Sequence, residues 1–279
     1  MRADLYLTSH GYVSGREKAK ELIADGNVSI DGRVLKKASD HVDGEGEHTV
    51  EIRNPLRYVG RGGLKLEAAL NAFSLNVEGK TALDIGASTG GFTDCLLQHG
   101  ASKVFAVDAG EGQLAKKLQE DARVIAREHL NARNLSLTDL SGEPADLIVM
   151  DVSFISATYL LLRFPMLLRE SGEAVCLIKP QFEVGKEWIG KGGIVRDPRA
   201  HHAAVERVFA AAEQAGLLPA GLIPSPITGG DGNREFLAYF CKNGSGKTPL
   251  EKQTILKITG GTSGDRRIRN AEDRTDYQL

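Results

Sequence analysis

The chain has 279 residues, of which 41% are hydrophobic and 26% are charged, and its formal net charge at pH 7 is −2. This composition is typical of a folded globular protein and excludes a disordered or fibrous chain, and the length allows one or two domains. A net charge so close to zero also excludes nucleic-acid binding by bulk electrostatics, so any such site must be local.

The sequence contains no uncharged apolar run of 18 residues, so we expect no membrane-spanning helix. Residues 1–13 lack the basic-then-apolar layout of a secretory signal, and we therefore expect a cytoplasmic protein. Cys95, Cys176 and Cys241 are far apart and show no CxxC spacing. We expect them to be reduced core residues, and we expect no metal site.

Residues 1–56 are predicted to form a small α+β module. A charged helix is expected over residues 16–24, ending at Asp25-Gly-Asn27 because glycine and asparagine tolerate a left-handed φ. Residues 28–30 alternate as a short strand, and Asp31-Gly32 predicts a tight hairpin. A module of this size is too small to be an enzyme by itself.

Two basic regions are candidates for RNA contact. In the module, phosphate contact is assigned to Arg2, Arg16, Lys18 and Lys20, although ion pairs on a solvated helix face are an alternative for the last three. Residues 57–63 are expected to link the module to the rest of the chain. Arg57 and Arg61 lie there without a nearby acidic residue, and a merely solvated basic linker is the alternative.

Residues 64–242 show alternating apolar strands and longer helices, the pattern of a parallel sheet covered on both faces. We expect strands at 81–85, 103–108, 145–151, 173–178 and 235–241, and helices at 64–73, 91–99, 157–168 and 201–215. Residues 243–279 are polar and glycine-rich, which predicts a disordered tail. Its GSGKT segment lacks the earlier glycine and the apolar helix of a phosphate-binding loop.

The segment LDIGASTGGF, residues 83–92, runs from a predicted strand into a predicted helix. Its glycines at 86, 90 and 91 let the backbone approach a ligand closely and leave helix N–H groups pointing at it. Asp108 stands about 20 residues further on, where a carboxylate after the next strand can accept hydrogen bonds from ribose hydroxyls. The two features together predict a ribose-containing ligand.

Three other interpretations of the turn remain at this point. A dinucleotide dehydrogenase would need glycine where Ser88 stands. Residues 86–90 also match the G-x-S-x-G elbow of α/β-hydrolases, with His201 or His202 as the base, but that elbow follows several strands and this turn follows the first. The third interpretation is a turn that binds nothing.

Six segments resemble the TlyA family, also called hemolysin A. They are GGLKL at 62–66, DIGASTGGFT at 84–93, DVSFIS at 151–156, IKPQFE at 178–183, GGIVRD at 192–197 and GNRE at 232–235. The N-terminal stretch resembles an S4 domain, a small RNA-binding fold, and the remainder resembles the FtsJ group of methyltransferases. The resemblance covers residues 2–242, and it departs from the S4 pattern at Ala3, where leucine is usual.

The resemblance implies an α/β fold, a Rossmann-like methyltransferase domain with a mostly parallel seven-stranded sheet whose last strand is antiparallel. A small α+β S4-like RNA-binding domain would precede it. The implied reaction is the transfer of a methyl group from S-adenosylmethionine to the 2′-hydroxyl of cytidine in ribosomal RNA. The implied partner is ribosomal RNA or a ribosomal subunit.

The FtsJ group carries a Lys-Asp-Lys-Glu tetrad, which the resemblance maps onto Lys65, Asp151, Lys179 and Glu235. Asp151 and Lys179 follow predicted strands, at the edge where open sheets present catalytic groups, and Glu235 reaches that edge only if its strand is antiparallel. Lys179 would steer or deprotonate the 2′-hydroxyl, and the two carboxylates would orient the ammonium groups.

The remaining site residues are predicted from their places relative to the glycine turn, to Asp108 and to Lys179. S-adenosylmethionine would be held at its methionine and sulfonium end by Asp84, Gly86, Ala87, Ser88, Thr89, Gly90, Gly91 and Phe92. Asp108 would bind its ribose, and Glu128 and Asn131 could reach the adenine, with a surface turn as the alternative. Lys186, in the loop after Lys179, could contact RNA.

Two functions of other classes are the alternatives to this one. A non-catalytic RNA-binding or ribosome-assembly factor could keep the glycine turn, but the complete tetrad argues against it. The hemolysin label suggests a membrane-active protein, yet no long amphipathic or apolar segment supports that activity.

Overall fold

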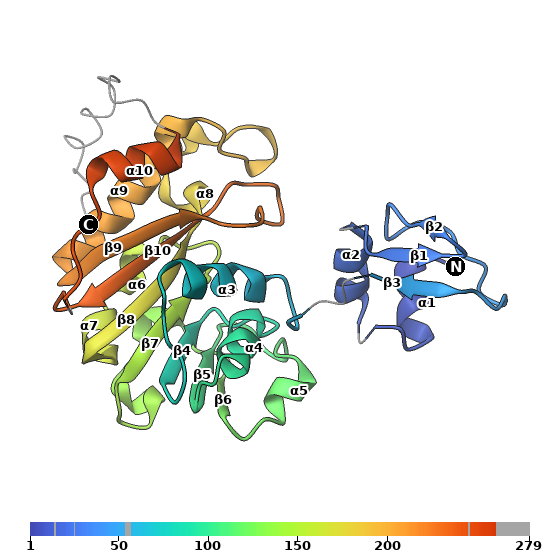
Figure 1. The fold of residues 1–279 in the computed structure, drawn as a ribbon, viewed down its shortest axis with the longest axis horizontal. Coiled ribbons are helices and arrows are strands. Elements are labelled where there is room, and N and C mark those ends of the chain that lie inside the picture. The colour runs from blue at the N-terminus through green and yellow to red at the C-terminus, as the bar shows by residue number, and fades with distance from the viewer. Residues whose placement is uncertain (14, 25, 54–56, 245, 261–279) are drawn as a thin grey trace. The chain divides into compact units, whose positions relative to one another are not determined.

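The computed structural model describes residues 1–13, 15–24, 26–53, 57–244 and 246–260 (Figure 1). The chain divides into two compact units, Met1–Gly63 and Leu64–Leu279. Within the described residues, no helix combines the length and the apolar character that crossing a membrane would require.

The first unit packs two helices against a small antiparallel sheet. The helices are α1 (Ala3–Ser9) and α2 (Arg16–Ala24), and the strands, in the order β2-β1-β3, are β1 (Val28–Ile30), β2 (Arg33–Val34) and β3 (Val50–Ile52). Asp31 and Gly32 have φ angles of 51° and 77°, which confirms the predicted tight hairpin. Ala3, where the S4 pattern has leucine, is fully buried in the core of this unit.

The second unit is built on one seven-stranded sheet with the order β6-β5-β4-β7-β8-β10-β9. Its strands are β4 (Thr81–Ile85), β5 (Lys103–Val107), β6 (Val124–Arg127), β7 (Ala145–Met150), β8 (Leu168–Ile178), β9 (Leu217–Pro224) and β10 (Phe236–Lys242). β10 is antiparallel to both of its neighbours, whereas β4 to β8 pair in parallel. The predicted Rossmann-like sheet with an antiparallel last strand is confirmed.

Helices cover both faces of this sheet (Figure 1). They are α3 (Gly62–Ala72), α4 (Gly91–Gln98), α5 (Lys116–Gln119), α6 (Thr158–Leu161), α7 (Phe164–Leu167), α8 (Pro180–Glu183), α9 (Pro198–Gln214) and α10 (Lys252–Thr259). Short 3-10 turns lie at η1 (Ala132–Asn134), η2 (Leu137–Leu140), η3 (Lys186–Trp188) and η4 (Lys191–Gly193).

The core lies mainly between the sheet and the helices α6, α7 and α9, where Met150, Phe164 and Val208 are fully buried. On the opposite face, Phe73 stacks on Tyr239 of β10 with ring centroids 5.2 Å apart. Cys95, Cys176 and Cys241 are buried, which confirms their predicted place in the core.

The sequence prediction of one helix was wrong, and two strands were not predicted. The single helix expected over 157–168 is two short helices, because Pro165 cannot continue the hydrogen bonding of α6 and lies instead in the first turn of α7, which begins at Phe164. β6 and β9 were missed: both lie at sheet edges, and β9 contains prolines at 219 and 224, which argue against a strand. β6 and β9 are strands because each pairs with its neighbour in the sheet, β5 and β10 respectively.

The tail predicted to be disordered contains helix α10 (Lys252–Thr259). Ile255 and Thr259 of this helix are buried, at 3% and 0% exposure, and α10 packs on α9 and β9. One face of this short helix is buried although the segment as a whole is polar. The composition of the segment therefore predicted disorder where a helix forms. The remainder of that prediction, residues 261–279, lies outside the described residues.

Candidate active site

A strand, a glycine-rich turn and a helix form one side of the site. β4 ends at Ile85, and Gly86 and Gly90 have φ angles of 84° and 95°, in the left-handed region that favours glycine. A Cβ atom on Gly86 would lie 2.5 Å from the carbonyl oxygen of Asp151. The turn therefore packs directly against the residue that follows β7, and a side chain at this position has no space.

Asp84 lies beneath this turn, fully buried. Its Oδ2 accepts a hydrogen bond from Thr93 Oγ1 at 2.6 Å, which joins β4 to α4. Its Oδ1 has no hydrogen-bond partner within the part of the chain that the structure describes. Burial raises the pKa of the Asp84 carboxyl to about 7.

This pKa predicts a stability that depends on pH. The pKa of Asp84 is about 7 in the folded protein and about 3.9 in an unfolded chain. Between these two pH values the folded state binds one more proton than the unfolded state does. The free energy of unfolding therefore falls as the pH rises from about 4 to 7. We expect Asp84→Asn, which cannot ionise, to recover a few kcal/mol at pH 8, at roughly 1.4 kcal/mol per pH unit. Urea unfolding from pH 5 to 8 measures this; superimposable wild-type and variant profiles would contradict it.

Asp108 directly follows β5 and faces the same turn. Its Oδ2 accepts a hydrogen bond from the Ser88 backbone N–H at 2.8 Å, and its Oδ1 accepts one from the Gly110 N–H at 2.7 Å. Glu128 accepts a hydrogen bond from the Gly112 N–H at 2.9 Å, so it contacts the loop that follows Asp108. Asp108 therefore lies where the sequence predicts a ribose-binding carboxylate, beside the turn.

The other predicted residues of this region have more local contacts. Asn131 is exposed and caps η1 by accepting a hydrogen bond from the Arg133 N–H at 3.0 Å. Ala87, Gly90, Gly91 and Phe92 are buried, whereas Ser88 and Thr89 are exposed at the tip of the turn. Gln113 was not predicted, and its Oε1 accepts a hydrogen bond from Ser88 Oγ at 3.2 Å.

The structure brings together the four residues of the predicted tetrad. Lys65 lies on α3, Asp151 and Lys179 directly follow β7 and β8, and Glu235 directly precedes β10. Lys65 Nζ is 2.7 Å from Glu235 Oε2 and 3.9 Å from Asp151 Oδ2. Lys179 Nζ is 2.6 Å from Asp151 Oδ1. We call Glu235, Lys65, Asp151 and Lys179, in this spatial order, the charged cluster.

The sheet topology explains this meeting. β7 and β8 are parallel neighbours, so their carboxyl ends lie at one edge, and antiparallel β10 begins at the same edge. The side chains in the cluster alternate in charge and are 2%, 10%, 20% and 11% exposed from Glu235 to Lys179. Alternation lets each buried ammonium face a carboxylate, which offsets the cost of removing the charges from water.

Ser153 and Phe154 lie in the loop that follows β7, within the DVSFIS motif, and the sequence predicts no role for them. Ser153 Oγ accepts a hydrogen bond from Lys179 Nζ at 2.8 Å. Phe154 is 92% exposed with a φ of 64°, and its ring centroid is 5.4 Å from that of Phe182. A bulky side chain rarely adopts a positive φ, and a phenylalanine is rarely so exposed. The sequence carries no signal for this exposure.

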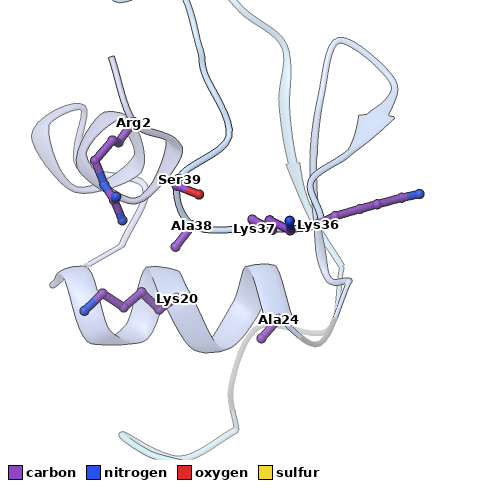
Figure 2. Close-up of a pocket in the computed structure, with 7 residues that line it drawn as sticks. All are labelled: Arg2, Lys20, Ala24, Lys36, Lys37, Ala38 and Ser39. Atoms are coloured by element: carbon purple, nitrogen blue, oxygen red, sulfur yellow. The ribbon is translucent and has the colours of Figure 1, made fainter.

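A basic cavity of about 500 Å³ lies in the first unit (Figure 2). It is lined by Arg2, Lys20, Ala24, Lys36, Lys37, Ala38 and Ser39. Two of the predicted RNA-binding residues, Arg2 and Lys20, are among them, and Lys36 and Lys37 were missed because they stand alone in a loop.

Arg2 and Arg16 both form ion pairs with the buried Asp4, each at 2.9 Å. The hydrogen bond from Arg2, with a further one from Arg16, lowers the pKa of Asp4 to about 2. The two guanidinium groups are half exposed, so one carboxylate holds both at the surface of this unit.

The last predicted RNA-binding residues lie elsewhere. Lys18 is partly exposed on α2, and Lys186 is exposed at the start of η3. Arg57 lies over the ring of Tyr58, with 5.5 Å between the guanidinium carbon and the ring centroid, and Arg61 is partly exposed. None of these four residues lines the basic cavity.

The hydrolase interpretation fails on geometry. Ser88 Oγ bonds Gln113, whereas His201 Nε2 lies 2.9 Å from the carbonyl oxygen of Val195 and His202 Nδ1 lies 3.4 Å from Thr259 Oγ1. In the described part of the chain, no hydrogen bond joins Ser88 to either histidine, so the turn has no general base of the kind a serine hydrolase needs.

Comparison with known proteins agrees with the methyltransferase interpretation. A model of the FtsJ-like methyltransferase family matches residues 58–242, and a model of the S4 domain matches residues 1–48. The 16S/23S rRNA (cytidine-2′-O)-methyltransferase TlyA of Mycobacterium tuberculosis is 41% identical over 238 residues, covering 85% of this chain and 88% of that protein. This chain belongs to the TlyA family. The resemblance drawn from the sequence motifs is thereby confirmed.

Other members of the TlyA family match the chain over most of its length. The Bacillus subtilis protein YqxC is 43% identical over 259 residues, covering 92% of each chain. A solved structure from Streptococcus thermophilus, which carries the name hemolysin, is 38% identical, with a TM-score of 0.75. It covers 98% of this chain and 97% of its own. The likeness to this structure therefore extends over both units of the chain.

Proposed function

We propose that this protein transfers a methyl group from S-adenosylmethionine to the ribose 2′-hydroxyl of a cytidine in ribosomal RNA. The observation that carries the proposal is the charged cluster, which lies against the glycine turn through Asp151. The name of the M. tuberculosis relative states the same reaction. A ribosomal RNA substrate would place the protein in the cytoplasm, with residues 1–56 as the RNA-binding module and residues 64–242 as the catalytic domain.

The turn fits S-adenosylmethionine. Gly86 and Gly90 present bare backbone, and Asp108 lies beside the Ser88 N–H, where a ribose could be bound. Asp84 Oδ1 is a buried oxygen whose hydrogen-bonding capacity is unused in the described structure. We assign the turn residues and Asp108 to the cofactor, with Glu128 and Asn131 toward its adenine. When bound, S-adenosylmethionine supplies the activated methyl group.

Lys179 is the residue that we assign to the 2′-hydroxyl. An ammonium group has three N–H donors. Lys179 donates one hydrogen bond to Ser153 Oγ at 2.8 Å, and its Nζ lies 2.6 Å from Asp151 Oδ1 in an ion pair. A further donor can then be directed at the substrate oxygen. A cation held in this way stabilises the negative charge that develops on the hydroxyl oxygen in the transition state, and it holds the oxygen in line for attack.

Lys65 and Glu235 have a supporting role in this proposal. Glu235 is almost completely buried and pairs with Lys65, which in turn faces the second oxygen of Asp151. Asp151 is therefore held from one side by Lys65 and directs its other oxygen at Lys179. Fixed charges of this kind require little reorganisation during the reaction.

The basic cavity and its neighbouring arginines are our candidate anchor for ribosomal RNA. Lysine and arginine side chains contact phosphates without reading sequence. Arg2, Lys20, Lys36 and Lys37 gather around one cavity, and Arg16 is fixed nearby by Asp4. The predicted contacts of Arg57, Arg61, Lys18 and Lys186 with RNA belong to the same proposal.

Phe154 is our candidate contact for the target base. Aromatic rings stack on unpaired bases in RNA recognition, and enzymes that modify a nucleotide commonly turn it out of its helix. Phe154→Ala should lower kcat/KM for RNA by about 5- to 150-fold, the equivalent of about 1–3 kcal/mol of stacking. Its melting temperature should not change, because the ring is 92% exposed.

The matched control for this variant is Tyr159→Ala. Tyr159 is also an exposed aromatic residue, 53% accessible, and it lies in the segment that follows the same loop. Steady-state methylation of an RNA fragment by both variants gives the comparison. Equal losses in the two variants would show that Phe154 has no special contact with the substrate.

The direct test of the proposed function is methyl transfer to ribosomal RNA. Ribosomes from cells that lack the gene are incubated with the protein and isotopically labelled S-adenosylmethionine, and 2′-O-methyl groups are then mapped by alkaline cleavage and mass spectrometry. We expect label on the ribose of cytidine. RNA binding without transfer would favour the non-catalytic assembly factor, and label on a base would refute the assignment of the 2′-hydroxyl.

A further inference from the structure

Two loops at the carboxyl edge of the sheet carry the Lys179–Asp151 ion pair. Residues 151–157 follow β7 and hold Asp151 and Ser153, and residues 179–183 follow β8 and include α8. Lys179 Nζ, in the second loop, forms an ion pair with Asp151 and donates a hydrogen bond to Ser153, both in the first loop. These contacts lie at the partly exposed end of the charged cluster. Their geometry therefore depends on how the two loops are held relative to each other.

That support comes from Glu183, the last residue of α8, which is 3% exposed. Its Oε2 accepts a hydrogen bond from Ser156 Oγ at 2.6 Å, and its Oε1 accepts one from the Ala157 backbone N–H at 2.7 Å. Arg207 of α9 donates to the backbone carbonyl of Glu183 at 2.9 Å. Hydrogen bonds therefore hold both the side-chain carboxylate and the backbone carbonyl of Glu183.

Burying a carboxylate is costly unless hydrogen bonds satisfy it. Burial raises the pKa of Glu183, and the hydrogen bonds from Ser156 and Ala157 oppose that rise. Both carboxylate oxygens of Glu183 therefore bind the loop that follows β7. Among the hydrogen bonds and ion pairs of the described residues, none joins the Glu183 side chain to Lys179 or Asp151.

We infer that Glu183 is a positioning residue, which locks the two loops together and so places Lys179 Nζ between Asp151 and Ser153. The inference rests on the proposed function, because it assigns a purpose to the position of Lys179. α8 is one helical turn that begins at Pro180, whose ring fixes φ. A shift at Glu183 is therefore transmitted to Lys179, at the other end of that turn.

The test uses two substitutions at Glu183. Glu183→Ala should lower kcat by about 10- to 100-fold, since misplacement by about 1 Å can cost 10² in rate. The KM for RNA and the affinity for S-adenosylmethionine should change less than threefold. Glu183→Gln should recover most of kcat, because its Oε1 can accept from Ala157 and its amide can donate to Ser156 Oγ. Ser156 can then donate to Thr158 Oγ1, which lies 2.7 Å away.

The control is Asp146→Ala. Asp146 Oδ2 accepts a hydrogen bond from the Thr81 backbone N–H at 2.9 Å, at the start of β7 and β4 and therefore at the opposite edge of the sheet. Its loss removes a comparable carboxylate contact without touching either loop. Kinetics are measured at a temperature at which circular dichroism shows every variant to be folded.

A second readout is independent of methyl transfer. Limited acylation by acetic anhydride, followed by peptide mass spectrometry, gives the reactivity of Lys179 relative to Lys80. Lys179 is 11% exposed and paired in the native protein, so it should react slowly. We expect Glu183→Ala to raise its relative reactivity several-fold, and Glu183→Gln and Asp146→Ala to leave it unchanged.

The outcomes separate the inference from the proposed function. If Glu183→Ala lowers only the melting temperature and changes neither kcat nor the reactivity of Lys179, Glu183 is merely a stabilising residue and the inference is overturned. If the native protein methylates no ribosomal RNA, the proposed function fails, and the acylation experiment still decides whether Glu183 places Lys179.

Discussion

Lys179→Ala is expected to lower the rate of methyl transfer by about 10²- to 10⁴-fold, the range for removing one proton-transfer group or one preorganised donor. The affinity for S-adenosylmethionine should stay within about threefold, because Lys179 contacts Asp151 and Ser153 and none of the turn residues assigned to the cofactor. Single-turnover transfer of labelled methyl groups and calorimetric titration with S-adenosylmethionine measure the two quantities.

Lys80→Ala is the matched control for this prediction. Lys80 Nζ pairs with Glu173 Oε2 at 2.7 Å and is 26% exposed, so it is also a partly buried lysine in an ion pair. It precedes β4 and therefore lies at the edge of the sheet away from the charged cluster. Full activity of Lys179→Ala would remove Lys179 from the reaction, and equal losses in both variants would indicate a general effect of lost ion pairs.

Lys65→Met is expected to destabilise the fold by about 3–5 kcal/mol, because it leaves a buried carboxylate without its partner. Glu235 is 2% exposed, and its Oε2 lies 2.7 Å from Lys65 Nζ. The activity of the variant should also be lost, since Asp151 then lacks the cation that holds its second oxygen. Urea unfolding and methyl transfer give the two measurements.

The double variant Lys65→Met/Glu235→Leu separates the two roles. Replacing a buried ion pair with apolar side chains of similar volume is often neutral or stabilising. We therefore expect the double variant to unfold near the native denaturant concentration and yet to remain inactive. An active double variant would show that this pair stabilises the fold and has no part in the reaction. A loss of less than about 1 kcal/mol in the free energy of unfolding of Lys65→Met would show that Glu235 can remain buried without its partner.

The elements that the sequence predicted well are those whose cause is local. β4 has the predicted bounds, 81–85, because five apolar-rich residues stand between turns, and α4 begins at Gly91, where the sequence predicts its start. The Asp31-Gly32 hairpin likewise follows from residues that accept a positive φ. In these cases neighbouring residues alone select the backbone conformation.

The elements that were missed depend on distant partners. β9 contains proline and glycine and becomes a strand because it pairs with β10 along its length. α10 looks like part of a polar tail until Ile255 is buried against the core. Composition reports average tendencies, whereas burial of one side chain on a distant surface can hold a short helix.

The same division applies to the site. The family resemblance predicted the tetrad, the residue pattern itself predicted the glycine turn and Asp108, and the strand pattern predicted that Asp151 and Lys179 stand at strand ends. Only the tertiary structure decided that β10 lies beside β8 and delivers Glu235 to Lys65, that Phe154 is exposed, and that Glu183 is buried between two loops. The reason is physical, because strand pairing and burial depend on contacts between residues far apart in the chain. The sequence of one segment does not show which distant segment it will contact.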